Sequence, residues 1–218
     1  MDDTTVRALA EGRDSGALVW ACLATVIVGS ACYGAVFGLW RSPVQAAYSA
    51  FKMPGLILAV TLGSAAINSM LAQVLGSGLS LRQVCACILL SLAIASALLG
   101  ALSPVMLFLV LQVPPQDSPQ AMTVYRLLLV GHTAAIGLSG IVGNVRLYQL
   151  LVALTGSRTI SIRVLTAWIM VSGLAGCELS WVASPFLAKP GIPVPLWNPD
   201  AFNGNFFEYL WRAMGELA

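Results

Sequence analysis

Residues 84–113 read VCACILLSLAIASALLGALSPVMLFLVLQV, a stretch that contains no charged side chain. About 20 consecutive apolar residues are enough for an α-helix to cross the hydrocarbon core of a bilayer. This stretch is longer than that, so a helix formed by it can cross with tilt. Pro104 lies inside it and predicts a kink, because proline removes a backbone hydrogen bond from a helix. The stretch therefore predicts a transmembrane helix.

Four further apolar runs lie before and after this stretch. Short polar or proline-rich segments separate them, for example residues 76–83 and residues 114–119. We therefore predict an all-α fold, a polytopic membrane protein whose transmembrane domain covers residues 15–188 as a bundle of five transmembrane helices. The predicted spans are about 15–40, 53–75, 84–113, 124–145 and 164–188.

The composition of the whole chain agrees with this reading. Of its 218 residues, 58% are hydrophobic and only 9% are charged, and the mean hydropathy is +0.86. A soluble domain has about 25% charged residues, so the lipid bilayer is the expected partner of most of the surface. The net charge of +2, without a run of basic residues, predicts no nucleic-acid partner.

The two ends of the chain differ from the spans. Residues 1–14 mix acidic and basic side chains and predict a surface segment. Residues 189–218 predict a proline-rich linker followed by a short C-terminal amphipathic helix, with Asn205 as its N-cap and Glu208 three residues on. This helix can lie in the membrane interface or pack on the loops of the bundle. Its apolar face would consist of Phe206, Leu210, Met214 and Leu217.

Basic residues predict the orientation, because cytoplasmic loops carry more lysine and arginine than external loops. With five spans, six basic residues fall on the side of the N-terminus and five on the opposite side. We therefore predict a cytoplasmic N-terminus and an external C-terminus. The six are Arg7, Arg13, Arg82, Arg146, Arg158 and Arg163; the five are Arg41, Lys52, Arg126, Lys189 and Arg212.

Glycines in three of the spans predict close helix packing, because small residues allow helix backbones to approach one another in a membrane. The pattern favours packing within the chain at least as well as dimerisation. The glycines are Gly34 and Gly38 in the first span, Gly137, Gly140 and Gly143 in the fourth, and Gly173 and Gly176 in the fifth.

His132 and Glu178 are the ionisable residues placed well inside the predicted spans. Such groups are costly to bury unpaired, so each is a functional candidate. Each stands about 10 Å from a span end on the same side of the membrane, so the two could meet at one depth. One interpretation is a proton path or ion site. The interpretation that we favour is a hydrogen bond that holds two helices together.

No catalytic residue, cofactor or metal site is predicted. The sequence GLSG at residues 137–140 matches the pattern around the nucleophile of rhomboid-type proteases, but a serine nucleophile needs a base within about 3 Å. The one histidine, His132, lies seven residues before Ser139 on the same predicted helix, about 10 Å away. The five cysteines form no CxxC pair and are expected to be small apolar packing residues.

Four short motifs between Phe51 and Glu208 together resemble an uncharacterised group of bacterial five-span membrane proteins related to the Yip1 family. The motifs are KMPGLIL at residues 52–58, LSLRQ at 79–83, SW at 180–181 with PF at 185–186, and GNFFE at 204–208.

The resemblance implies a non-enzymatic membrane factor with a cytoplasmic N-terminus, of a kind that is associated with vesicle trafficking in eukaryotes. It also implies a neutral residue at the position of Glu178, so this carboxylate departs from the pattern. We therefore predict a scaffold, an accessory factor or a subunit of a larger complex in the bacterial inner membrane, with other membrane proteins or a second copy as partners. The alternative is a small transporter or a proton-conducting or ion-conducting subunit that uses His132 and Glu178.

Overall fold

The computed structural model describes residues 16–208 of the chain. Within this range it contains five helices that are each long and apolar enough to cross a membrane, which confirms the predicted all-α membrane fold. The helices are α2 (Gly16–Leu39), α3 (Pro43–Val74), α4 (Leu81–Gln112), α5 (Ala121–Thr155) and α6 (Arg158–Ala183).

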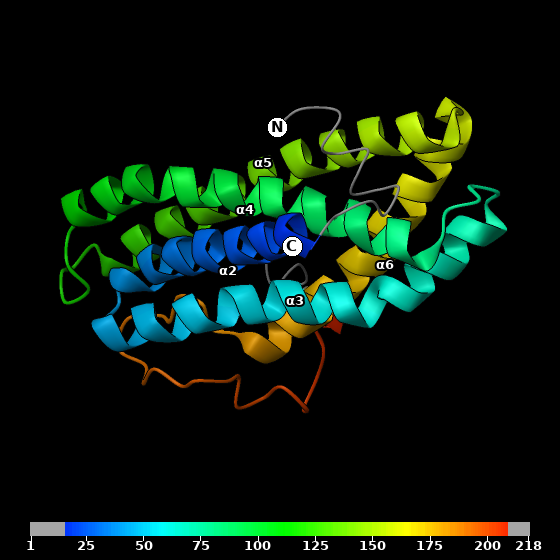
Figure 1. The fold of residues 1–218 in the computed structure, drawn as a ribbon. Coiled ribbons are helices and arrows are strands. Elements are labelled where there is room, and N and C mark those ends of the chain that lie inside the picture. The colour runs from blue at the N-terminus through cyan, green and yellow to red at the C-terminus, as the bar shows by residue number, and fades with distance from the viewer. Residues whose placement is uncertain (1–15, 209–218) are drawn as a thin grey trace.

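Consecutive helices run in opposite directions, and α2 lies between α3 and α4 (Figure 1). Helix α5 packs on α4, helix α6 packs on α3, and α5 and α6 also meet each other. The bundle therefore has two ends. At the tail end α2, α4 and α6 finish and α3 and α5 begin; at the opposite end, here called the arginine end, α2, α4 and α6 begin.

Helix α3 begins at Pro43, before the predicted start at residue 53. The Ser42 hydroxyl accepts a hydrogen bond from the Gln45 amide at 3.1 Å and caps the helix, and Pro43 occupies its first turn. Lys52 falls outside the predicted span, but it is a residue of the helix and is buried. A single charge did not interrupt the helix, because the fold gives that charge polar partners.

Helix α5 extends to Thr155, past the predicted end at residue 145, and α6 starts at Arg158 instead of residue 164. The connection is therefore only Gly156 and Ser157. Gly156 has a φ of 66°, in the left-handed region that glycine adopts without strain, and it ends α5. Ser157 caps α6 by accepting a hydrogen bond from the Ile160 amide at 3.4 Å.

Glycines set the contacts between α2 and its two neighbours. A Cβ at Gly34 or Gly38 would overlap the backbone carbonyls of Ser49 or Gln45 in α3. On another face of α2, a Cβ built on Gly100 of α4 would lie only 3.2 Å from the Cα of Gly29. These helices are therefore in backbone contact.

The other glycines that we predicted at helix contacts fall into two groups. Gly143 lies at a close contact, where a Cβ would be 2.9 Å from the Ser91 carbonyl oxygen of α4. A Cβ at Gly137, Gly140 or Gly173 would meet nothing within 4 Å, and one at Gly176 would only touch Val60 at 3.9 Å. Most of the glycines of α5 and α6 therefore do not lie at helix contacts within residues 16–208.

The apolar core consists of two clusters, one toward each end of the bundle. The cluster near the arginine end includes Val26, Val84, Cys87, Leu151 and Trp168. The cluster near the tail end is richer in aromatic residues and includes Tyr33, Phe37, Trp40, Met53 and Leu187.

The segment that follows α6, residues 184–208, is here called the tail. It has no regular structure until residues 206–208, where a short helix begins (Figure 1). Asn205 caps this helix as predicted, because its side-chain oxygen accepts a hydrogen bond from the Glu208 amide at 2.8 Å. The rest of the predicted amphipathic helix, and the predicted surface segment 1–14, lie outside the described residues.

Candidate functional site

A buried polar cluster on α3 faces the start of the tail. Gln45, Ser49 and Lys52 are spaced by four and three residues, so they share one face of the helix. All three are almost fully buried, and the exposed fraction of Lys52 is only 2%. We call this set the α3 polar cluster.

The cluster donates hydrogen bonds to two backbone carbonyls of the tail. Lys52 Nζ donates to the Pro185 carbonyl oxygen at 2.9 Å. Gln45 Nε2 donates to the same oxygen at 2.9 Å and to that of Phe186 at 3.0 Å, and the Ser49 hydroxyl donates to Phe186 at 2.6 Å. These carbonyls follow the last turn of α6, so they lack the hydrogen-bond partners that a helix would provide. In a membrane such groups must find partners within the protein.

Two aromatic rings lie near the charged end of Lys52. Its Nζ lies 5.8 Å from the centre of the Phe186 ring and 6.0 Å from that of Trp197. Both distances are within the range of cation–π attraction. No carboxylate of residues 16–208 forms an ion pair with it. Carbonyl oxygens and ring faces of the tail therefore stabilise this buried cation.

His132 of α5 belongs to the same region. It is fully buried, its Nδ1 lies 2.9 Å from the Tyr33 hydroxyl of α2, and its ring stacks on Phe37 with centroids 4.3 Å apart. Phe37 also stacks on Phe186, at 6.2 Å. A continuous set of rings therefore connects His132 with Lys52.

Glu178 lies elsewhere, half-buried on α6. Its Oε2 accepts a hydrogen bond from the Phe206 amide of the tail at 3.4 Å. Among residues 16–208, neither His132 nor Glu178 has the other as a hydrogen-bond or ion-pair partner. The structure therefore places the two candidates in separate environments, one holding α5 to α2 and the other fixing the tail.

A second polar contact joins α3 to α6 nearer the arginine end. Asn68 Nδ2 donates to the Ser172 hydroxyl at 3.1 Å, and the Trp168 indole N–H donates to the Asn68 carbonyl at 2.7 Å. Sequence reasoning missed this contact and the α3 polar cluster, because it searched the spans for ionisable residues only. Two groups of polar residues spaced by three or four positions along α3 were the signal that could have revealed them. These residues are Gln45, Ser49, Lys52, Ser64 and Asn68.

The other candidates for chemistry have structural partners. Ser139 is buried and donates to the carbonyl of Ala135 in its own helix, at 2.9 Å. Its side chain therefore serves α5 itself. Within the described part of the chain no group of three or more histidine, cysteine or acidic side chains could hold a metal ion. The cysteines are free thiols.

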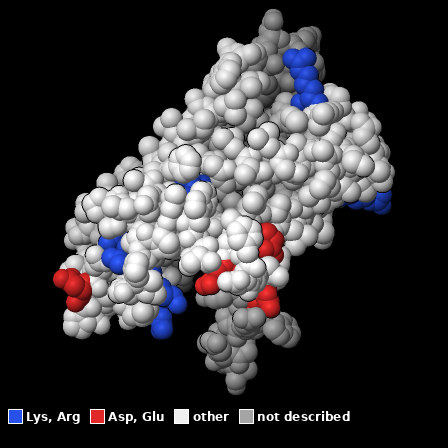
Figure 2. All heavy atoms as spheres, turned by 90° about the horizontal axis from the view of Figure 1, so that it is seen from below, with Lys and Arg blue, Asp and Glu red and all other residues white. Residues whose placement is uncertain are grey.

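The two ends of the bundle differ in charge. Arg82, Arg146, Arg158 and Arg163 are exposed toward the arginine end, and residues 16–208 place no acidic side chain there. The four described acidic residues lie in or beside the tail and the loop before α5. They are Asp117, Glu178, Asp200 and Glu208. Figure 2 shows this from below: red side chains gather over the tail and the left end, whereas the right end shows blue without red.

Comparison of the chain with models of protein families, with curated proteins and with solved structures finds no match. The fold and the contacts above define the class, an integral membrane protein that forms a five-helix bundle.

Proposed function

We propose that this chain is a non-catalytic integral membrane protein that acts as a scaffold or accessory factor, or as a subunit of a larger membrane complex. The observation that supports this most is the α3 polar cluster. Its side chains donate to the protein's own tail carbonyls at 2.6 to 3.0 Å. A buried lysine used in this way stabilises the shape of the protein, and shape is what a scaffold presents to partners.

We further propose that the protein resides in the bacterial cytoplasmic membrane with its arginine end in the cytoplasm. Basic residues near the ends of spans favour the cytoplasmic side, and six of the eleven fall on the side of the arginine end against five on the other. Helix α2 starts at the arginine end and α6 finishes at the tail end. This orientation therefore puts residue 16 near the cytoplasm and the tail outside, in agreement with the resemblance to Yip1-related proteins.

Reporter fusions in the loops test the orientation. Fusions at residues 79 and 157 should report the cytoplasm, and a fusion at residue 117 should report the outside. The opposite result at all three positions would reverse the proposed orientation without affecting the fold.

Chemical cross-linking in native membranes, followed by purification of the full chain, tests the scaffold role. We expect one or more membrane proteins, or a second copy, to be recovered at constant ratio with the wild-type chain. A variant with a loosened tail, Lys52→Met, should recover them less well. Recovery of the chain alone, with the same result in every variant, would contradict the proposal.

A proton-conducting or ion-conducting subunit is the second candidate. One observation favours it: His132 Nε2 is buried and has no hydrogen-bond partner within residues 16–208. Proteoliposomes that contain the purified chain should then conduct protons, and His132→Gln should abolish the flux without reducing the amount of folded protein. Under the scaffold proposal no flux above that of empty liposomes is expected.

The scaffold proposal also predicts that Glu178→Gln leaves assembly and phenotype unchanged, because the amide oxygen can still accept the hydrogen bond from the Phe206 amide.

A further inference from the structure

A groove of about 550 Å³ runs between α5 and α6 and opens to the outside of the bundle. Its walls include Gly137, Gly140, Asn144 and Tyr148 of α5 and Leu165 and Ile169 of α6. The two helices meet near their two-residue turn and separate from there, since α5 packs on α4 and α6 on α3. Glycines at 137 and 140 leave the space between them unfilled.

The groove lies within the membrane-spanning part of both helices, so it opens toward lipid. Its walls are mostly apolar. Asn144, the polar amide among them, donates its side-chain N–H to the Gly140 carbonyl of its own helix at 2.8 Å. Water has few partners in such a groove, whereas a hydrocarbon chain loses nothing by entering it.

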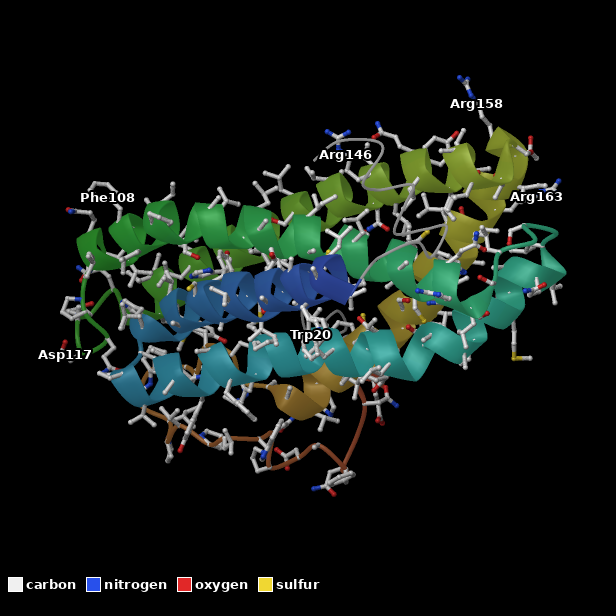
Figure 3. All side chains as sticks on the ribbon, viewed as in Figure 1. Trp20, Phe108, Asp117, Arg146, Arg158 and Arg163 are labelled. Atoms are coloured by element: carbon white, nitrogen blue, oxygen red, sulfur yellow. The ribbon has the colours of Figure 1, made fainter. Side chains whose placement is uncertain are left out.

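The rim of the groove at the arginine end is positively charged. Arg158 precedes Leu165 by seven residues and Ile169 by eleven, spacings that put all three on one face of α6. The helix rises about 10 Å from Arg158 to Leu165. Arg158 and Arg163 are exposed and point away from the bundle at this end (Figure 3). No acidic residue of the described chain lies at this end to neutralise them.

We propose that the α5–α6 groove binds one acyl chain of an anionic phospholipid, whose headgroup phosphate is held by Arg158 with Arg163 adding positive charge. An arginine guanidinium binds phosphate through two parallel N–H donors. The geometry agrees with this ligand, because Arg158 stands above the apolar walls as a headgroup stands above its chains, while Arg163 lies on another face of α6 at the same end. A helix of a second copy could fill the same groove, but it would leave the arginines without a counter-charge.

The test uses the full chain in nanodiscs of phosphatidylcholine mixed with phosphatidylglycerol, and in nanodiscs of phosphatidylcholine alone. Native mass spectrometry after transfer to detergent measures the lipid that stays bound. We expect the wild-type chain to retain phosphatidylglycerol in preference to phosphatidylcholine. Arg158→Gln should reduce this preference about fivefold, since one arginine near a membrane surface contributes about 1 kcal/mol.

Variants that fill the groove test whether an acyl chain binds in it. Gly140→Leu should abolish retention of the bound lipid, and the milder pair Gly137→Ala and Gly140→Ala should weaken it even if the larger side chain disturbs folding. Matched controls are Gly63→Leu, whose glycine also has open space around it, and Arg126→Gln, an exposed arginine near the tail end. Neither control should change retention.

Three results would overturn the proposal. Equal retention of both lipids shows that the charged rim selects nothing. Unchanged retention in the glycine variants shows that the lipid binds elsewhere. A wild-type dimer that Gly140→Leu converts to a monomer shows that a second copy of the chain occupies the groove. Because none of these results depends on the scaffold role, the inference and the proposed function can fail separately.

Discussion

Helices α2 and α5 both contain glycines at spacings typical of helix contacts, yet one pair in each helix is used in opposite ways. Gly34 and Gly38 of α2 lie against the backbone of α3, where even one methyl group would overlap carbonyl oxygens. Gly137 and Gly140 of α5 face an open groove. The spacing of small residues therefore predicts a surface that allows close approach, but not whether the chain itself fills that surface.

The largest effect is expected at a filled surface, for Gly38→Ala. The added methyl group would lie 2.6 Å from the carbonyl carbon of Gln45 and 2.7 Å from the Ala46 amide nitrogen, so α2 and α3 must separate. We expect a loss of about 2–3 kcal/mol of stability. Thermal unfolding in detergent, followed by the reactivity of the buried thiols of Cys22 and Cys87, measures this loss.

The matched variant is Gly63→Ala on α3. A methyl group there meets no atom within 4 Å, and alanine is the better helix former. Its unfolding temperature should equal or exceed that of the wild-type chain. Equal losses in both variants would show that the α2–α3 contact is looser than described.

The next largest loss of stability is expected for a contact between α3 and the tail, which is close-packed like that between α2 and α3. Lys52→Met keeps the apolar length of the side chain and removes the donor to the Pro185 carbonyl. We expect a loss of about 1 kcal/mol and faster cleavage of the tail in limited proteolysis. Lys189→Met, at an exposed lysine of the tail, is the control. Identical cleavage in the two variants would exclude Lys52 as a tail anchor.

A smaller effect is expected where α5 contacts α2 through the Tyr33 hydroxyl, which lies 2.9 Å from His132 Nδ1 and donates to the His132 carbonyl oxygen at 3.4 Å. Tyr33→Phe removes both of these hydrogen bonds. The expected loss is about 1 kcal/mol or less, because the stacking of His132 on Phe37 remains. Unfolding temperatures measured beside Tyr148→Phe, a tyrosine that lines the groove, give the difference. A larger loss of stability in Tyr148→Phe than in Tyr33→Phe would show that the contact between Tyr33 and His132 does not stabilise the packing of α5 on α2.

The smallest effect is expected at the open surface, for Gly137→Leu. Its side chain would enter the groove and displace lipid, without meeting protein atoms near its Cβ. We expect stability within about 0.5 kcal/mol of wild type. A loss comparable to that of Gly38→Ala would mean that α5 and α6 close on each other in the membrane.

The sequence was sufficient to predict the fold class and the presence of five spans, because uncharged runs have few alternatives to membrane helices. It was less informative about boundaries. Lys52 and Arg146 lie just outside the predicted spans 53–75 and 124–145, yet both are within helices. Lys52 is hydrogen-bonded to a tail carbonyl, and Arg146 is exposed at the helix surface. These environments arise from tertiary contacts, which the local sequence does not contain.

The candidate site could likewise be predicted only in part. Sequence reasoning found His132 and Glu178 because ionisable residues are rare in spans. Their partners, Tyr33 and the Phe206 amide, are distant in the chain and could not be inferred from spacing. Estimates of depth along a helix placed the two residues at one level, but they did not specify the direction in which each side chain points.

The short connection between α5 and α6 also has a consequence for how the protein enters the membrane during synthesis. Gly156 and Ser157 alone join the two helices, and two residues span only about 7 Å. The turn therefore cannot reach across the bilayer, so α5 and α6 lie in the membrane as a tight hairpin with this turn on one side. In the proposed orientation, Arg158 and Arg163, directly after that turn, oppose its transfer to the outside. In that orientation the direction of the helical pair is set before the tail has been made.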